Sequence, residues 1–152
     1  SIVEETIKYN SLRKKYMVEK IQSSAGDLSA KDIAILGLSF KPETDDMRDS
    51  PSIDIIEELI NLNANVFAYD PEAMHEARKI FSDKINYMLN AQDCITGKDI
   101  LVVLTEWNEF RALNPVEISK LMDGNIVIDL RNIYDPKSMQ NANLKYFSLG
   151  KK

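Results

Sequence analysis

Ile33-Ala-Ile-Leu-Gly-Leu38 is a short apolar run, and the polar stretch Ser39 to Ser50 follows it directly. A run of this kind is typical of a strand that is covered on both faces in a parallel sheet. Pro51 then opens a helical pattern, with Ser50 or Asp49 as its N-cap and the proline at the first helical position. The first unit of the fold is therefore predicted to be a strand at 33 to 38, a long loop and a helix.

The same alternation continues along the sequence. We expect further strands at 65 to 69, 85 to 89, 100 to 104, 126 to 130 and 144 to 149, and helices from Asp70-Pro71 to about Ile80, near Ala91 and from Pro115 to Met122. Strands that alternate with helices across short connections favour an α/β fold, here a Rossmann-like, doubly wound, mostly parallel sheet with helices on both faces. In such a sheet, ligands lie beyond the carboxyl ends of the strands.

A long amphipathic helix is predicted before this sheet, at residues 2 to 22, with Gly26 as its stop. Its apolar residues recur at spacings of three and four, which is typical of a connector helix. The helix has more apolar residues than a single narrow stripe against one neighbour requires. Part of the helix is therefore expected to pack on something outside this chain or, as an equal alternative, across its own domain.

Composition limits the classes of function. The 152 residues, at 17.3 kDa, make one domain, and the net charge of −5 gives no general field for nucleic acid or an anionic membrane. The single Cys94 and the single His75 exclude a disulfide framework and argue against a zinc site. Cys94 has no evident basic partner and is predicted to be inert, and His75 to face solvent. With no apolar run long enough for a membrane span, we expect a cytoplasmic protein.

The loop after the first strand carries two cations, Lys41 and Arg48. It has one glycine, Gly37, and therefore lacks the glycine-rich pattern that binds a dinucleotide pyrophosphate. The two cations could bind an anionic ligand at the edge of the sheet. They could equally hold the loop together through ion pairs with its carboxylates, which are Glu43, Asp45, Asp46 and Asp49.

Charged residues also follow the other strands. Asp70 lies 33 residues after Gly37, beyond the usual gap of about 20 for a ribose-binding acid, so a helix cap is the preferred role. Arg131 follows the strand at 126 to 130 and is predicted to share an edge with Lys41, where it could bind a phosphate or pair with Asp129 or Asp135. In the segment Thr105-Glu106-Trp107, we expect the tryptophan to pack in the core or its rim and Glu106 to anchor a loop or cap a helix.

Four motifs together resemble a known family. They are Leu36-Gly-Leu-Ser-Phe-Lys-Pro-Glu-Thr-Asp-Asp-Met-Arg-Asp-Ser-Pro-Ser52, Ala68-Tyr-Asp-Pro71, Leu104-Thr-Glu-Trp-Asn-Glu-Phe-Arg111 and Ile128-Asp-Leu-Arg-Asn-Ile-Tyr134. In this order they resemble the C-terminal, UDP-binding domain of the UDP-glucose 6-dehydrogenase family, one of the nucleotide-sugar dehydrogenases. The resemblance spans nearly the whole chain.

The resemblance implies a function for the whole enzyme. The family oxidises UDP-glucose to UDP-glucuronate with two NAD+, through a thiohemiacetal and a thioester on a catalytic cysteine. That cysteine and the glycine-rich loop belong to the family's other parts, and Cys94 does not match the cysteine motif. This chain is therefore expected to anchor the nucleotide sugar, to contain no catalytic residue and to be inactive alone.

The resemblance also assigns residues and partners. It implies that Phe40, Lys41 and Arg131 contact the UDP-sugar and that Arg48 reaches the NAD held by an N-terminal domain. Residues 1–25 correspond to the end of the family's central connector and dimerisation helix, and residues 31–152 to the UDP-sugar-binding domain of a homodimer. Leu130 stands where many members have a glycine, so the backbone at Arg131 is expected to differ slightly.

Other readings remain open from the sequence. The domain could come from a dehydrogenase of another nucleotide sugar, such as UDP-N-acetylmannosamine, or be a stand-alone nucleotide-binding module. A phosphoacceptor receiver domain would use Asp45, Asp46 and Thr105, but its acceptor aspartate is missing around Tyr87 to Asn90.

Overall fold

The computed structural model describes residues 2–149, with side chains from Arg13 onward, and the fold is built on one parallel sheet. The described strands follow the order β3-β2-β1-β4-β5-β6, and every neighbouring pair is parallel. Their bounds are β1 Asp32–Leu36, β2 Asn65–Tyr69, β3 Asn86–Tyr87, β4 Ile100–Val103, β5 Ile126–Asp129 and β6 Lys145–Ser148. This order belongs to the doubly wound Rossmann type, whose direction reverses between β1 and β4, and it confirms the predicted fold class.

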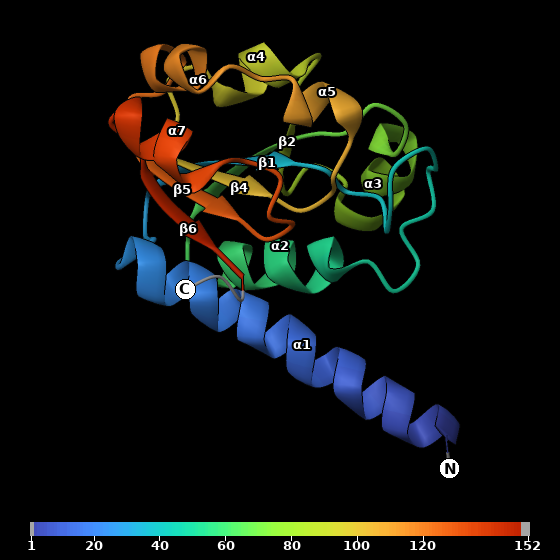
Figure 1. Ribbon diagram of the computed structural model, residues 1–152. Coiled ribbons are helices and arrows are strands. Elements are labelled where there is room, and N and C mark those ends of the chain that lie inside the picture. Colours follow the sequence, from blue (N-terminus) through green and yellow to red (C-terminus); the bar gives the residue numbers. More distant parts are fainter. Residues whose placement is uncertain (1, 150–152) are drawn as a thin grey trace.

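Helices cover both faces of the sheet (Figure 1). On one face lie α1 (Ile2–Ala25), α2 (Pro51–Asn61) and α3 (Met74–Phe81), which share an apolar core with residues of β1 such as Ile33 and Ile35. On the other lie α4 (Ala91–Ile95), α5 (Asn108–Arg111), α6 (Pro115–Leu121) and α7 (Pro136–Asn141), over a second core that includes Leu36 and Leu101. Because both faces are covered, the central strands are apolar throughout, as the run at 33 to 38 indicated.

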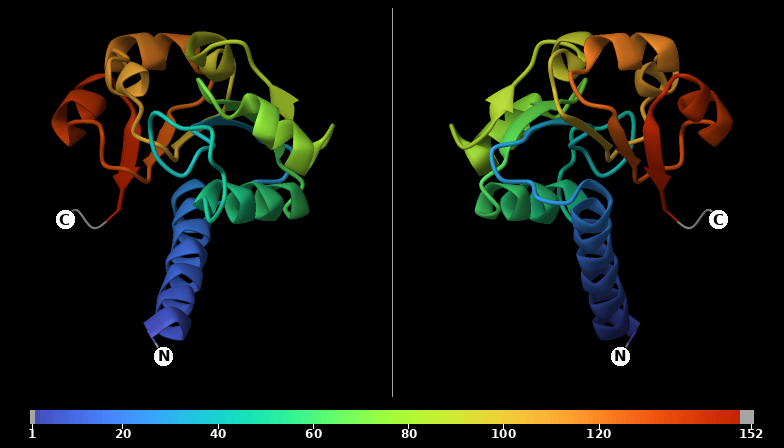
Figure 2. Two further views of the ribbon diagram at one scale, coloured as in Figure 1. Left: turned by 90° about the vertical axis from the view of Figure 1, so that its right-hand side faces the viewer. Right: turned by 90° about the vertical axis from the view of Figure 1, so that its left-hand side faces the viewer.

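Helix α1 is anchored at one end and projects at the other. Met17 and Ile21, one turn apart, are 2% and 1% exposed and pack in the core beneath α2, so this part of the helix lies across its own domain. The N-terminal half extends away from the globular body in every view (Figures 1 and 2). The helix ends at Ala25, and Gly26 follows it with φ of +75°, as the predicted stop. Packing by the apolar side chains before residue 13 lies outside the described side chains and stays a prediction.

Some element boundaries differ from the sequence predictions. Strand β1 ends at Leu36 rather than residue 38, because Gly37 turns the chain with φ of +101° and the next two N–H groups bond to Asp70. Helix α3 begins at Met74 rather than at Asp70-Pro71, because a hydrogen-bonded turn comes first. Helices α5 and α7 were not predicted, although Asp135 before Pro136 is an N-cap signal that the structure uses.

Candidate functional site

The site begins just beyond the ends of β1 and β4, where the chain after each strand meets the other. Gly37 lies there, and a Cβ atom on it would approach Thr105 Cβ and Oγ1 to 2.5 Å. The threonine hydroxyl donates a hydrogen bond of 2.8 Å to the carbonyl of Ser39. The loop that leaves β1 is therefore fixed against β4 at its first residues, and only glycine fits at position 37.

Asp70 fills the crevice beside this loop with its own carboxylate. It is 1% exposed, and its Oδ2 atom accepts hydrogen bonds from Leu38 N at 2.8 Å, Ser39 N at 3.0 Å, Ser39 Oγ at 3.1 Å and Trp107 Nε1 at 3.3 Å. In a dinucleotide-binding sheet, the N–H groups after the first strand face the pyrophosphate of the cofactor. Here a protein carboxylate takes that position, so the residues of this crevice do not fit NAD.

The second oxygen of Asp70 organises the approach to α3. Its Oδ1 atom accepts hydrogen bonds of 2.9 Å from the backbone N–H groups of Glu72 and Ala73. Asp70 therefore holds the turn before α3, close to the capping role expected from the sequence. With both oxygens engaged, it is not placed to bind a ribose.

Phe40 is presented to solvent by a loop that is well held on both sides. Its backbone N–H donates to Asp46 O at 2.7 Å, while Ser50 Oγ and Ser52 Oγ both donate to Leu38 O, at 2.9 and 2.7 Å. Ser50 also caps α2, as predicted. The Phe40 side chain is nevertheless 48% exposed, which is unusual for a large aromatic ring on a constrained loop.

The two cations of this loop differ in their partners. Arg48 forms two hydrogen bonds to Asp46, from Nε at 3.0 Å and from Nη2 at 2.9 Å, and both side chains are in solvent. These bonds lower the pKa of the Asp46 carboxyl to about 2. Lys41 is exposed and forms no ion pair within the part of the chain that the structure describes. The alternative of a loop-holding ion pair therefore applies to Arg48 and not to Lys41.

A buried aspartate positions Arg131. Asp129 is fully buried, its Oδ1 atom accepts from Arg131 N at 3.0 Å, and its Oδ2 atom accepts from Tyr134 N at 3.0 Å and from Tyr146 Oη at 2.6 Å. Burial and this hydrogen bond raise the pKa of Tyr146. The turn after β5 is thus closed around one carboxylate, and the left-handed position falls at Asn132, with φ of +57°, rather than at Leu130.

The guanidinium of Arg131 bonds to Glu106 through Nε. Glu106 follows β4, so the pair joins the ends of two neighbouring strands. Asp129 and Asp135 were the predicted alternative partners of Arg131, and Glu106 was not predicted. Both members of the pair are about three-quarters buried, which holds the guanidinium in place.

Phe40 and Arg131 line one small cavity of about 260 Å³. Its other lining residues are Arg13, Lys14 and Met17 from α1, with Asp49 and Pro51 at the start of α2. Lys41 does not line it, and Arg48 lines a separate hollow near Ile53 and Ile80. We call the first cavity the Phe40–Arg131 pocket.

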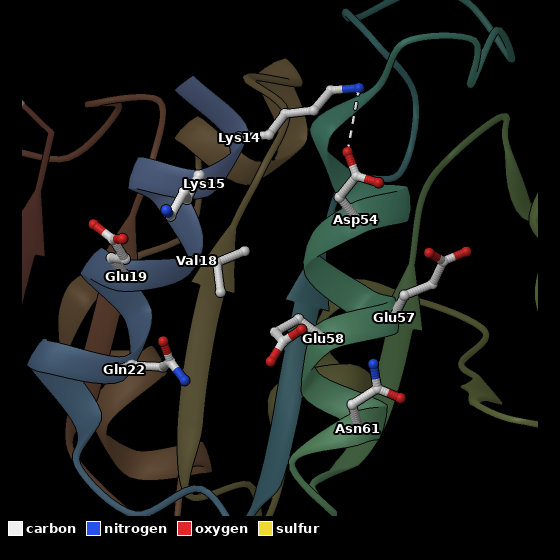
Figure 3. A pocket seen from close by; sticks show the side chains of 9 residues that line it. All are labelled: Lys14, Lys15, Val18, Glu19, Gln22, Asp54, Glu57, Glu58 and Asn61. Carbon is white, nitrogen blue, oxygen red and sulfur yellow. Dashed lines mark ion pairs between the residues drawn. The ribbon is translucent and has the colours of Figure 1, made fainter. Parts of the chain in front are cut away.

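Helix α1 brings basic residues to this pocket that were not predicted as part of a site. Their signal in the sequence is the run Arg13-Lys14-Lys15, which was interpreted only as the polar side of a connector helix. Lys15 faces a different groove, between α1 and α2, where Lys14 Nζ reaches Asp54 Oδ2 at 3.3 Å (Figure 3). That groove also contains Glu57 and Glu58 and has no excess of positive charge.

The remaining candidate residues are structural. Cys94 is buried, its Sγ lies 3.3 Å from Phe67 O, and burial raises the pKa of its thiol to about 12, which supports the prediction that it is inert. The charge of Lys98 acts to lower the pKa of the Cys94 thiol, so the prediction that Cys94 has no basic partner was wrong. His75 is exposed, as expected.

Among the described residues there is no cluster of metal-binding side chains and no helix long and apolar enough to cross a membrane.

The sheet order defines a Rossmann-like α/β domain, in which a protein carboxylate takes the usual dinucleotide position and a pocket with a net positive lining lies elsewhere at the same edge. The profile of the UDP-glucose/GDP-mannose dehydrogenase family, UDP binding domain, matches residues 34–136. The chain belongs to this family of nucleotide-sugar dehydrogenases and contains its UDP binding domain. The receiver-domain reading is wrong, since receivers have the strand order 2-1-3-4-5.

Individual relatives agree with this assignment. A UDP-glucose 6-dehydrogenase from Rhizobium meliloti (strain 1021) is 40% identical over 151 residues, which cover 99% of this chain and 34% of that protein. One from Rickettsia conorii (strain ATCC VR-613 / Malish 7) is 42% identical over 153 residues, with 99% and 35% covered. The chain thus spans about a third of the length of these relatives.

A solved structure confirms the fold. The crystal structure of an NDP-N-acetyl-D-galactosaminuronic acid dehydrogenase from Methanosarcina mazei Go1 superposes with a TM-score of 0.83 at 22% identity, covering 100% of this chain and 32% of that chain.

Proposed function

We propose that this chain anchors the uridine diphosphate of UDP-glucose for a UDP-glucose 6-dehydrogenase, and that the whole enzyme oxidises this sugar nucleotide to UDP-glucuronate with two NAD+. The observation that carries the proposal is the meeting of Phe40 and Arg131, from loops 91 residues apart in sequence, at one pocket beyond the carboxyl ends of the strands. Ligands of doubly wound sheets bind at this edge.

The chemistry of the pocket suits a diphosphate. A guanidinium offers several N–H donors in a fixed fork, which matches phosphate oxygens, and the contact with Glu106 holds this fork in position before the ligand arrives. Lys41, exposed and without an ion pair among the described residues, supplies a second charge beside Phe40. Binding energy at this end of the ligand would hold the reacting sugar towards the catalytic part of the enzyme.

We propose that NAD binds mainly to an N-terminal domain outside this chain. The crevice that would hold it here is occupied by Asp70, and the relatives are about three times as long as this chain. Arg48 lies on an exposed loop, from which it would reach a cofactor held by that domain. The chain alone should then form no NADH from UDP-glucose, as absorbance at 340 nm would show.

We further propose a homodimer formed through α1, in a cytoplasmic enzyme. Tyr16 is 52% exposed on this helix, whose N-terminal half leaves the globular body. Sedimentation of the chain should show self-association, and a version that starts at Arg13, which keeps Met17 and Ile21 in the core, should be a monomer. If the full chain and the shortened version both sediment as monomers at the same high concentration, the dimer through α1 is refuted.

Calorimetric titration of UDP into the 152-residue chain tests the anchoring role. Lys41→Ala and Arg131→Ala should each weaken binding by about 1.5 to 3 kcal/mol, or roughly ten- to a hundredfold, the scale of a charged hydrogen bond. Lys120→Ala, an exposed lysine on α6 at the opposite face, is the control and should bind as the wild type does. Normal UDP affinity in both site variants, with normal thermal melts, would refute the role.

A dehydrogenase of another nucleotide sugar, such as UDP-N-acetylmannosamine, is the lesser alternative. The proposed contacts hold the diphosphate and do not read the sugar, so they serve either substrate. Turnover of the whole enzyme with each nucleotide sugar would distinguish the two.

A further inference from the structure

We infer that Arg13 of helix α1 is an additional anion-binding residue of the Phe40–Arg131 pocket, so that this helix takes part in binding the diphosphate of the ligand. The inference rests on the proposed function and adds to it a residue that no sequence motif assigned.

The first observation is the distribution of charge around the pocket. Three cations line it, Arg13, Lys14 and Arg131, against one carboxylate, Asp49. Two of these cations already have acidic partners outside the lining, since Lys14 bonds to Asp54 at 3.3 Å and Arg131 bonds to Glu106.

Arg13 differs from the other two cations. It is exposed and forms no ion pair with any residue that the structure describes, Asp49 included. Its guanidinium therefore has its full set of donors free for a ligand, at a pocket where the balance of charge is positive.

The second observation is the position of Arg13 on the helix. It lies one turn before Met17, so the two side chains share a face of α1. Met17 is 2% exposed and fixed in the core, and it also lines the pocket. The packing of Met17 therefore fixes the rotation of α1 and directs the face that carries Arg13 towards Phe40 and Arg131.

The third observation is the size of the pocket. At about 260 Å³ it is smaller than most sites for a whole nucleotide, which begin near 300 Å³. It is large enough for part of one, and with arginines on two sides that part is the diphosphate. Arg13 would bind it from α1 and Arg131 from the turn after β5.

Lys15 provides a matched control. Arg13 and Lys15 are the two neighbours of Lys14 in the sequence, and both are exposed. Lys15, however, lines the groove between α1 and α2 instead of the pocket (Figure 3). Arg13→Gln and Lys15→Gln each remove one positive charge and keep a good helix former. Comparing the two variants therefore distinguishes a direct contact between Arg13 and the ligand from a general electrostatic effect of the positive charges on α1.

The test is calorimetric titration of the 152-residue chain with UDP and, separately, with inorganic pyrophosphate, with a thermal melt of each variant. Arg13→Gln should weaken UDP binding about tenfold and weaken pyrophosphate binding as well, because the contact is to the phosphates. Lys15→Gln should stay within about twofold of the wild type for both probes.

The other outcomes overturn the inference. Equal losses in the two variants would mean a general electrostatic effect of α1. Wild-type affinity in Arg13→Gln, together with a loss in Arg131→Ala, would refute the role of Arg13 and leave the proposed function intact. A wild-type chain that binds neither UDP nor pyrophosphate would refute both.

Discussion

Replacing Asp70 by alanine should destabilise the chain more than any change at an exposed carboxylate. The side chain is 1% exposed and accepts six hydrogen bonds, four on Oδ2 and two on Oδ1. Two of the donors are the backbone N–H groups of Leu38 and Ser39, which are themselves buried. Alanine offers them no acceptor, and neither can move without moving β1.

The cost follows from these orphaned donors. Each buried donor left without a partner costs about 1 to 3 kcal/mol, and water entering the space recovers part of this. With two buried backbone donors and weaker contributions from the others, we expect a loss of about 3 to 5 kcal/mol. For a domain of this length, that corresponds to a fall in melting temperature of about 10 to 15 °C.

Thermal and urea melts of three variants measure the effect. Asp70→Ala should show the full loss and Asp70→Asn a smaller one, because the amide keeps one acceptor oxygen. Glu72→Ala removes an exposed carboxylate two residues away and should stay within about 0.5 kcal/mol of the wild type. Added formate should raise the melting temperature of Asp70→Ala more than that of the wild type. If Asp70→Ala melted within about 2 °C of the wild type, the carboxylate would not be organising the crevice.

Further predictions concern three residues, Cys94, Tyr146 and Gly37. The Cys94 thiol, with its pKa raised to about 12, should resist alkylation at pH 8 in the native chain and react on unfolding in urea, as mass spectrometry would show. The pKa of Tyr146 is raised above the ordinary 10.0, so the folded state keeps a proton that the unfolded state loses, and the free energy of unfolding should fall as pH rises above 10. Tyr146→Phe should be less stable at pH 7, because Asp129 loses a hydrogen bond of 2.6 Å, and its denaturation curves should show a shallower decline above pH 10. Gly37→Ala should cost at least about 2 kcal/mol in urea melts, because its Cβ would lie 2.5 Å from Thr105 at a φ of +101°.

The strands and the start of α2 were predictable because local signals determine them. Four consecutive buried residues in β4 show as an apolar run, and Ser50 followed by Pro51 is a strong N-terminal signal for a helix. Short helices were not predictable in this way. The six residues of α7 are stabilised by the Asp135 cap and by the burial of Met139, and burial is a property of the tertiary structure.

The candidate site was predictable in its residue types and not in its pairings. Lys41 after β1 and Arg131 after β5 belong to the same edge of a doubly wound sheet, so the sequence could place these two cations at one edge, whereas Phe40 was predicted as a contact only through the family resemblance. The partner of Arg131 depends on the register of β4 against β5, which no local pattern gives. Arg13 joins the pocket only because α1 packs against its own domain through Met17 and Ile21.

Helix α1 packs against the domain through Met17 and Ile21 and projects at its N-terminal end, so a small rotation at the packed part moves the other end further. The helix rises 1.5 Å per residue, so the part from Ile2 to Arg13 extends about 16 Å beyond the position where the pocket meets it. A tilt of about 10° at Met17 would move the N-terminal end of the helix, about 22 Å away, by about 4 Å, which is more than a packed side chain can move. Small adjustments of Arg13 and Met17 at the pocket are thus amplified along the projecting half of the helix.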